Sequence, residues 1–360
     1  MTKTESAQVK GIALILMFWH HLFGGGSYLT LPENNWLPVI SERLVLTIAG
    51  EDSACLFMFL FCSGFGLYFS FYSRRTGLKD WLMRFIRILI PYWLIMAATI
   101  VYLAARGNFH PEYLPMNLFA AVRDDERLYV SFSWFIKIYL EIIAVLPLLR
   151  LLDRKLGRKP WLEAPLYLII PGIVSSLIWD YVFNLENHRI VFLLVYALAE
   201  VCEWLPLFLI GMLAAKYRLL EKFWNFLKKI HPLLLAAISV GTVWLILLGR
   251  YRQVLQRYQI LAWLQALLFV AAFLALIRLS RVQHPRVLPF LGNNSLYFWL
   301  LSGFFFLNTV ELQFMIYFPR YSVLILLWQI LLETPFVILF QHASEAVLRQ
   351  ISNCLRMTPK

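Results

Sequence analysis

The chain has 360 residues, of which 61% are hydrophobic and only 15% are charged, and its mean hydropathy is +0.68. Soluble domains carry about 25% charged residues, and here the apolar excess recurs along the whole length, which excludes an ordinary soluble domain. The net charge of +12 does not indicate a nucleic-acid partner, because the basic residues form short clusters between apolar runs, as in membrane loops. We expect an all-α fold, a polytopic transmembrane helix bundle.

Apolar runs long enough to cross a bilayer predict about ten membrane-spanning helices. They lie near residues 9–27, 43–72, 85–105, 133–152, 161–180, 190–214, 231–249, 259–279, 294–311 and 321–342. The second run is longer than a bilayer requires, which predicts a tilt or a break. Most Lys and Arg residues fall on one side of these runs, so both termini are predicted to be cytoplasmic. Residues 1–345 are expected to form one membrane domain, followed by a short cytoplasmic tail over 346–360.

The chain lacks the usual signs of metal, disulfide and soluble-enzyme sites. Its four cysteines show no paired spacing, which indicates neither a disulfide framework nor a zinc site. The sequence also lacks G-x-x-x-x-G-K, H-E-x-x-H and G-x-S-x-G. We therefore expect no bound metal, and turn to polar residues within the apolar runs, where a charge costs at least about 2.5–3.5 kcal/mol.

The first run carries a lysine near its start and two histidines near its end, in KGIALILMFWHH. Lys10 and His21 are eleven residues apart, almost three helical turns, so both side chains face one direction about 16 Å apart along the axis. His20 points about 100° away. An imidazole near mid-membrane is suited to taking a proton from a hydroxyl. The alternative, stronger for His20, is a structural hydrogen bond to a neighbouring helix.

Two later motifs offer a close-packing surface and a basic face. Ser63 and Gly64 lie in the middle of the second run, where small residues let helices or a bound chain approach closely. Arg84 and Arg87 are three residues apart on one helix face, and guanidinium groups suit phosphate recognition. Plain helix packing and a positively charged membrane anchor are the respective alternatives.

The fourth run opens with WFIKIYLE and holds both a cation and an anion. Lys137 and Glu141 have i,i+4 spacing, which predicts an ion pair that lowers the cost of burying each charge. Trp134 lies seven residues before Glu141 and shares its face. Either residue could contact a substrate, although a structural ion pair is the favoured role of Glu141.

In their order along the chain, these features resemble the integral-membrane acyltransferase-3 family, which O-acylates sugars and other cell-envelope acceptors. The matching positions are Lys10 and His21; Ser63-Gly64-Phe65; Arg84, Arg87 and Pro91-Tyr92-Trp93; Trp134-Phe135 with Pro147; Leu205 to Met212; and Leu291, Gly292 and Ser295. Three family positions differ, because Phe57, Ile143 and Ser302 replace an acidic residue, a tyrosine and a histidine. Loss of that late histidine favours His21 as a single base.

The resemblance implies a reaction and a set of roles. Acyl-CoA, most commonly acetyl-CoA, would be the co-substrate, and the acceptor would be a cell-surface polysaccharide or a lipid-linked sugar. His21 would be the general base. Lys10, Ser63, Gly64, Arg84 and Arg87 would bind the acyl-CoA, whereas His20, Trp134 and Glu141 would contact the acceptor.

The resemblance also implies a place for the protein. It would lie in the inner (cell) membrane of a bacterium, in contact with membrane lipids. Association into a homo-oligomer is compatible with this place. The rival function is a non-enzymatic exporter or flippase of a polysaccharide or lipid-linked sugar.

Overall fold

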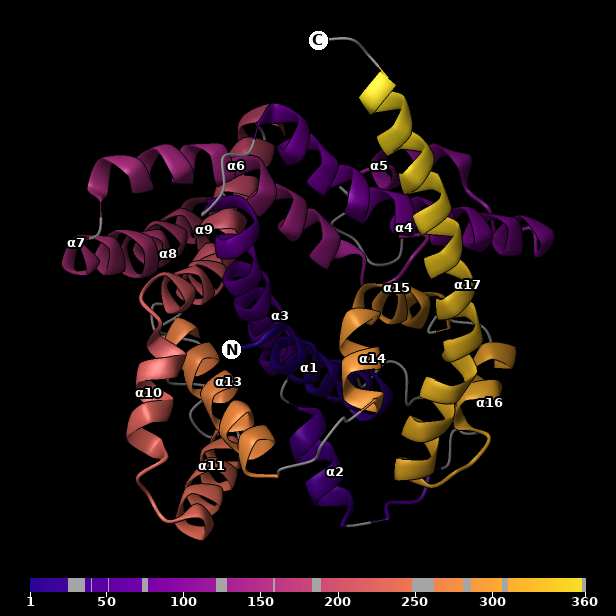
Figure 1. Cartoon of the computed structure of the whole chain (residues 1–360). Coiled ribbons are helices and arrows are strands. Elements are labelled where there is room, and N and C mark those ends of the chain that lie inside the picture. The colour runs from indigo at the N-terminus through magenta and orange to yellow at the C-terminus, as the bar shows by residue number, and fades with distance from the viewer. Residues whose placement is uncertain are drawn as a thin grey trace. The chain divides into compact units, whose positions relative to one another are not determined.

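The computed structural model describes residues 1–24, 36–39, 41–50, 52–72, 77–120, 128–157, 159–182, 189–247, 262–280, 286–305 and 310–357. Within these ranges the chain is helical and contains no strand; one isolated bridge joins Leu37 and Tyr321 (Figure 1). The all-α prediction is therefore confirmed.

The chain divides into two compact units. Unit 1 comprises Met1–Met17, Gly50–Thr76 and Ala144–Gly292, and unit 2 comprises Phe18–Ala49, Gly77–Ile143 and Asn293–Lys360. Two helices contribute to both units, α1 (Lys3–Phe23) and α6 (Trp134–Leu156).

Unit 1 is built around the packing of α3 against α9. Its helices are α3 (Asp52–Leu67), continued by a π-helical turn (Tyr68–Tyr72); α7 (Pro160–Ala164), a π-helical turn (Pro165–Ile169) and α8 (Ile170–Val182); α9 (Arg189–Lys216), α10 (Leu219–Leu227), α11 (Pro232–Leu247), α13 (Ala262–Leu279) and most of α14 (Val287–Asn293).

Two glycines allow the backbones of α3 and α9 to come into close contact. A Cβ atom on Gly64 of α3 would stand 1.9 Å from the carbonyl oxygen of Phe208, and one on Gly211 of α9 would stand 2.0 Å from that of Phe61. Each helix therefore occupies the space that a side chain on the other would need. Small residues permit this close backbone contact in membrane helices.

Unit 2 gathers helices from three separate parts of the chain. They are α2 (Glu42–Ala49); α4 (Leu78–Ala105); a 3₁₀ turn (Pro111–Tyr113) and α5 (Leu114–Asn117); α15 (Ser295–Phe305); α16 (Val310–Tyr317); and α17 (Ser322–Met357). Here α17 packs against α4 and α15, and α15 also packs against α4. The rings of Phe305 in α15 and Phe336 in α17 pack edge to face, with their centroids 6.0 Å apart.

Fewer helices qualify as membrane spans than the sequence predicts. Within the described residues, four segments are long and apolar enough to cross a membrane: Leu78–Ala105, Pro160–Trp179, Leu194–Lys216 and Ser322–Cys354. A fifth would arise if α2 and the following helix formed one broken span. Three more apolar helices, Pro232–Ile246, Trp263–Leu279 and Ser295–Phe305, are shorter. A count of about ten is not confirmed, but the second run is broken as expected, because α2 ends at Ala49 and α3 begins at Asp52.

The C-terminal segment is helical up to Met357. Helix α17 continues well beyond residue 342, where the last apolar run ends, and stops at Met357. Side-chain pairs one turn apart support its polar end: Gln341 Nε2 donates to Glu345 Oε1 at 3.0 Å, and Arg349 forms an ion pair with Glu345 at 3.6 Å. Such pairs extend a helix where apolar packing stops.

Candidate functional site

The end of α1 that belongs to unit 2 is fixed by hydrogen bonds to α2. The indole nitrogen of Trp19 donates to the carbonyl of Val45 at 3.1 Å, and Nδ1 of His20 lies 2.6 Å from the carbonyl oxygen of Ala49. Ala49 is the last residue of α2, where carbonyl groups lack partners within the helix. Because a carbonyl can only accept, Nδ1 of His20 carries the hydrogen, as a structural histidine would require.

His21 is partly buried and its ring lies flat against an aromatic neighbour. The imidazole stacks on the ring of Phe132, with ring centroids 3.8 Å apart and planes inclined by 22°. The ring of His20 is 5.1 Å away on the same helix. The stack restricts the orientation of the His21 ring, whereas the hydrogen bond to Ala49 restricts His20. The two histidines thus have different surroundings, as their separation around α1 predicts.

Phe132 reaches His21 through an unusual backbone conformation. Its φ is +64°, in the left-handed region, which costs a bulky residue about 1–3 kcal/mol. The indole nitrogen of Trp299 donates to the Phe132 carbonyl at 3.1 Å. On the same helix, a Cβ on Gly303 would stand 2.1 Å from the Ser131 carbonyl oxygen, so α15 and this segment touch backbone to backbone. Two contacts from α15 therefore offset the strain at Phe132.

A buried tyrosine of α4 supports the same segment from another side. The hydroxyl of Tyr92 donates to the backbone carbonyl of Asn117 at 2.6 Å, and the side-chain oxygen of Asn117 accepts the backbone N–H of Tyr129 at 3.1 Å. Tyr92 and Asn117 are both fully buried. Tyr92 belongs to the motif around Arg84 and Arg87, but sequence reasoning gave it no role. The 25 residues between Tyr92 and Asn117 hide this link from any local pattern.

The arginine pair lies on the N-terminal half of α4, in unit 2. Arg84 is partly buried and Arg87 is exposed. Arg84 is within electrostatic reach of Asp80, Arg87 and Tyr139, the last of these on α6. The indole nitrogen of Trp81 donates to the Ile143 carbonyl at 2.8 Å, which fixes this half of α4 against α6. The guanidinium groups of Arg84 and Arg87 therefore lie on a part of α4 that is held in place by α6.

At the start of α6, the predicted ion pair is confirmed. Lys137 Nζ lies 3.2 Å from Glu141 Oε1, and both side chains are about one-fifth exposed, at 18% and 21%. Trp134 is the first residue of α6 and is partly buried. Contact of Trp134 or Glu141 with an acceptor stays a prediction. The ion pair accounts for Glu141 without a substrate.

The remaining candidates, Lys10, Ser63 and Gly64, belong to unit 1. Lys10 is within electrostatic reach of Cys62, the residue before Ser63, so the structure brings the lysine to this part of α3. Gly64 faces α9, whose backbone fills the space beside it. Close helix packing therefore accounts for Gly64, while acyl-CoA binding by these residues stays a prediction. Lys10 and His21 lie on the same uninterrupted helix, as expected.

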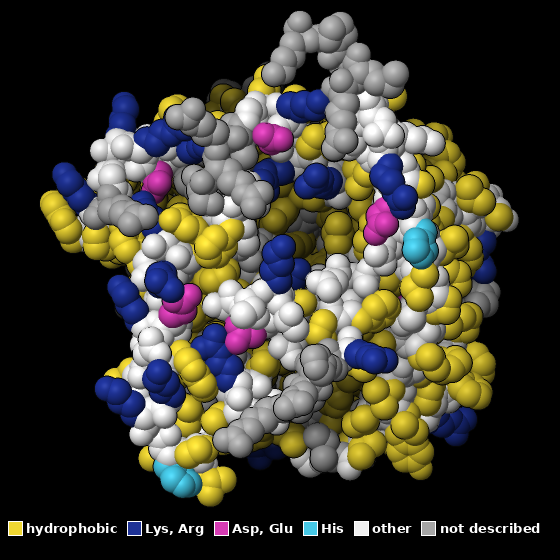
Figure 2. All heavy atoms as spheres, in the orientation of Figure 1, with side chains coloured by type: hydrophobic (Ala, Val, Ile, Leu, Met, Phe, Trp, Pro, Cys, Tyr) yellow, Lys and Arg dark blue, Asp and Glu magenta, His cyan; other side chains and the backbone are white. Residues whose placement is uncertain are grey.

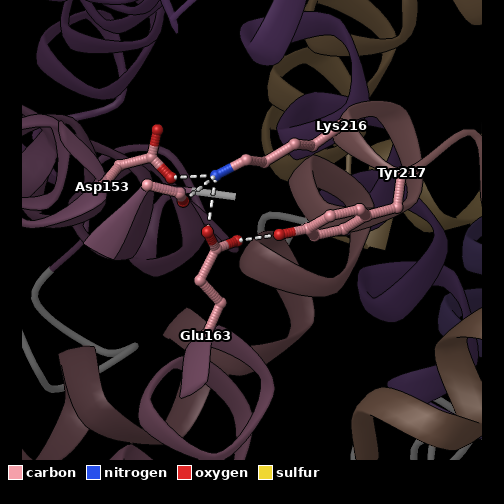
Figure 3. Close-up of polar contacts among 5 residues, drawn as sticks. Asp153, Glu163, Lys216 and Tyr217 are labelled. Carbon is pink, nitrogen blue, oxygen red and sulfur yellow. Dashed lines mark hydrogen bonds and ion pairs between the residues drawn. The ribbon is translucent and has the colours of Figure 1, made fainter. Parts of the chain in front are cut away.

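A buried ion network in unit 1 was missed by the sequence analysis. Lys216 Nζ lies 2.6 Å from Asp153 Oδ1 and 2.7 Å from Glu163 Oε1, and the Tyr217 hydroxyl donates to Glu163 Oε2 at 3.0 Å (Figure 3). The Glu163 side chain is completely buried. The acidic partners stand 63 and 53 residues before the lysine, so no spacing rule reveals them. Removing one partner of such a buried pair typically costs about 3–5 kcal/mol.

Fold and site together define an all-helical protein with apolar helices of membrane-spanning length and a histidine stacked in a partly buried position. A family model described as an acyltransferase domain matches residues 7–342, nearly the whole chain. The chain belongs to this family, acyltransferase-3, which confirms the resemblance seen in its motifs. Neither the curated proteins nor the solved structures contain a match to it.

Proposed function

We propose that the protein moves an acyl group, most simply acetyl, from acyl-CoA to a hydroxyl of a cell-surface polysaccharide or lipid-linked sugar, with His21 as the general base. Membership of the acyltransferase-3 family supports the transfer of an acyl group. The observation that carries the choice of base is the stack of His21 on Phe132. A base must hold its nitrogen in line with the proton that it takes, and this stack restricts the ring.

The proposed reaction is a direct transfer. A ring nitrogen of His21 takes the proton of the acceptor hydroxyl while its oxygen attacks the thioester carbonyl. The carbon–sulfur bond breaks, and the departing thiolate of coenzyme A takes the proton back from the imidazolium. The products are the acyl ester and free coenzyme A, and the histidine returns to its starting state.

The acyl-CoA carries phosphate groups that require cationic partners. Arg84 and Arg87 share one face of α4, and a guanidinium group offers paired donors to phosphate. We assign the coenzyme A phosphates to these two residues. Lys10, within electrostatic reach of Cys62, is a further cation for the donor, or for lipid headgroups. Loss of either arginine should chiefly raise the KM for acyl-CoA.

The direct test replaces His21 with alanine. Membranes containing the variant receive acetyl-CoA labelled in the acetyl group, and label transferred to envelope glycans is measured by scintillation counting and mass spectrometry. Loss of one general base should lower transfer by about 10²–10⁴-fold, whereas the amount of protein should not change. Undiminished transfer would remove His21 from the mechanism.

His20→Gln is the matched control, because it alters the neighbouring ring and keeps a side-chain N–H that can donate to Ala49. This variant should retain most of the activity. An equal loss in the two variants would mean that the damage lies in the packing of α1, and the assignment of the base to His21 would fail.

A further inference from the structure

Helix α10 differs from its neighbours in having a strongly amphipathic exposed face. It begins at Leu219, directly after the candidate membrane span Leu194–Lys216, and is followed by the apolar helix α11. It therefore starts at the level where a span ends. Short amphipathic helices at this level lie in the membrane interface, with an apolar edge in the hydrocarbon boundary and basic residues at the phosphates.

The buried side of α10 is fixed within unit 1. The guanidinium group of Arg278, near the end of α13, lies 4.8 Å from the centre of the Trp224 ring. The same guanidinium group donates to both carboxylate oxygens of Glu5, at 2.7 and 3.2 Å. Leu220 is buried on this side as well. The rotation of α10 about its axis is therefore set, and with it the direction of the exposed residues.

The exposed side changes from apolar to basic around the helix. Phe223 and Phe226 are 43% and 64% exposed, so both rings lie on the outward side of the helix. Lys222 lies about 40° from Phe226 around the helix. Lys229 belongs to the turn that follows α10, and its backbone N–H donates to the carbonyl of Phe226 at 3.2 Å. Both lysines are exposed, and neither forms an ion pair with a described residue.

Lys228 offers an internal comparison. It is exposed like the other two lysines, but it is the C-cap residue of α10, with its backbone N–H bonded to the carbonyl of Trp224 at 2.9 Å. Helical geometry continued to this residue places it about 120° from Lys222, away from the phenylalanines. Figure 2 shows Lys and Arg side chains beside hydrophobic ones along the left edge of the molecule, where Figure 1 places α10. Lysines next to an inserted apolar edge extend their ammonium groups to the phosphate level.

We infer that Lys222 of α10 and Lys229 of the turn that follows it, beside Phe223 and Phe226, form a binding site for the phosphate of an anionic phospholipid. The two phenylalanines set the depth of the helix, and the two ammonium groups meet the headgroup charge. This inference does not depend on the acyl-transfer reaction. Its ligand is a lipid of the surrounding leaflet, since the aromatic edge requires acyl chains next to the phosphate.

The test uses the purified full-length protein in neutral detergent. Phosphatidylglycerol or phosphatidylcholine with identical acyl chains is titrated, and bound lipid is counted by native mass spectrometry. The wild-type protein should retain phosphatidylglycerol in preference to phosphatidylcholine. Lys222→Gln and Lys229→Gln should each weaken phosphatidylglycerol binding by about fivefold, the effect of one basic residue at an anionic surface. Lys228→Gln should change it by less than twofold.

Three results would overturn the inference. They are equal binding of the two lipids by the wild-type protein, equal weakening by all three glutamine variants, and thermal stabilisation by inorganic phosphate as large as that by phosphatidylglycerol. The second result would indicate a general effect of net charge, and the third a site for free phosphate. Thermal unfolding in phosphatidylcholine alone should be the same for all variants, which separates lipid binding from folding.

Discussion

At the scale of single residues, Phe132 links backbone strain to the orientation of His21. A phenylalanine with φ of +64° persists where surrounding contacts outweigh its cost, and here these include the Trp299 hydrogen bond and the contact at Gly303. Strained residues gather at functional sites. The contacts from α15 that hold Phe132 in this conformation therefore also support the His21 site.

Replacing Phe132 with leucine should weaken that support. The change keeps an apolar side chain of similar size but removes the ring that stacks on His21. A stacked aromatic pair contributes about 0.5–1.5 kcal/mol beyond burial, so kcat should fall by about two- to tenfold with little change in KM. Acetyl transfer at saturating acetyl-CoA measures the effect.

Phe135→Leu is the matched comparison. Phe135 lies three residues further on and stacks on Trp299 at 4.8 Å. The Phe135→Leu variant therefore loses a similar ring contact. The ring of His21 stacks on Phe132 and so keeps its partner in this variant. Similar losses of kcat in both variants would show that aromatic packing in general, and not support of His21, is responsible.

At the scale of elements, the contact between α3 and α9 explains two of the sequence motifs. Gly64 of the Ser63-Gly64-Phe65 motif and Gly211 of the motif from Leu205 to Met212 each face the other helix at the same contact. A change at either position must push the helices apart, because the obstructing atoms belong to the backbone. The glycines in these motifs are therefore needed for the packing of α3 against α9, in addition to any role in binding.

Gly64→Ala should lower the midpoint of thermal unfolding, because the new Cβ would meet the Phe208 carbonyl. Overpacking of this kind costs about 1–3 kcal/mol. Gly66→Ala on the same helix is the control, since no atom lies within 4 Å of its Cβ position, and alanine favours a helix over glycine. Differential scanning fluorimetry in detergent compares the two. A Gly64→Ala protein as stable as Gly66→Ala would contradict the packing account.

Some features of the helices could be predicted from the sequence, and others could not. The helical fold and the Lys137–Glu141 pair follow from local patterns and are confirmed. The length of the second apolar run also predicts a tilt or break, but not its position after Ala49. The stack of His21 on Phe132 joins segments more than 100 residues apart. It also uses a backbone conformation that phenylalanine does not favour. Such contacts arise from tertiary packing, which overrides local preference.

At the scale of the whole molecule, ion pairs join segments that are distant in the sequence. Arg278 binds Glu5 across 273 residues, and Lys216 binds Asp153 across 63. The sequence shows Lys216 and Arg278 among the basic residues that follow apolar runs. Membrane topology rules predict their side of the membrane but not their partners. The partners depend on how helices pack, which one sequence does not reveal.

The Glu5–Arg278 pair should make stability depend on pH. Burial alone would raise the pKa of Glu5, but hydrogen bonds from Arg278 and from the Thr2 backbone outweigh burial and hold that pKa below its ordinary value of 4.5. A lowered pKa in the folded state stabilises the protein above the unfolded pKa and is lost as pH falls through the folded one.

The comparison is between wild-type protein and Glu5→Gln. Wild type should have the higher unfolding midpoint at pH 7, and the difference should shrink as pH falls below about 4.5, where unfolded glutamate becomes protonated. Thermal unfolding between pH 7 and pH 3 in one detergent measures both. A difference that stays constant over this range would show that the carboxylate charge contributes nothing.

The bond between His20 and Ala49 also decides how the two nitrogens of that ring are used. Because Nδ1 donates to the carbonyl of Ala49, the lone pair of the neutral imidazole lies on Nε2. The junction of the first two helices therefore employs one ring nitrogen as a donor, and any further partner of this imidazole must meet the other.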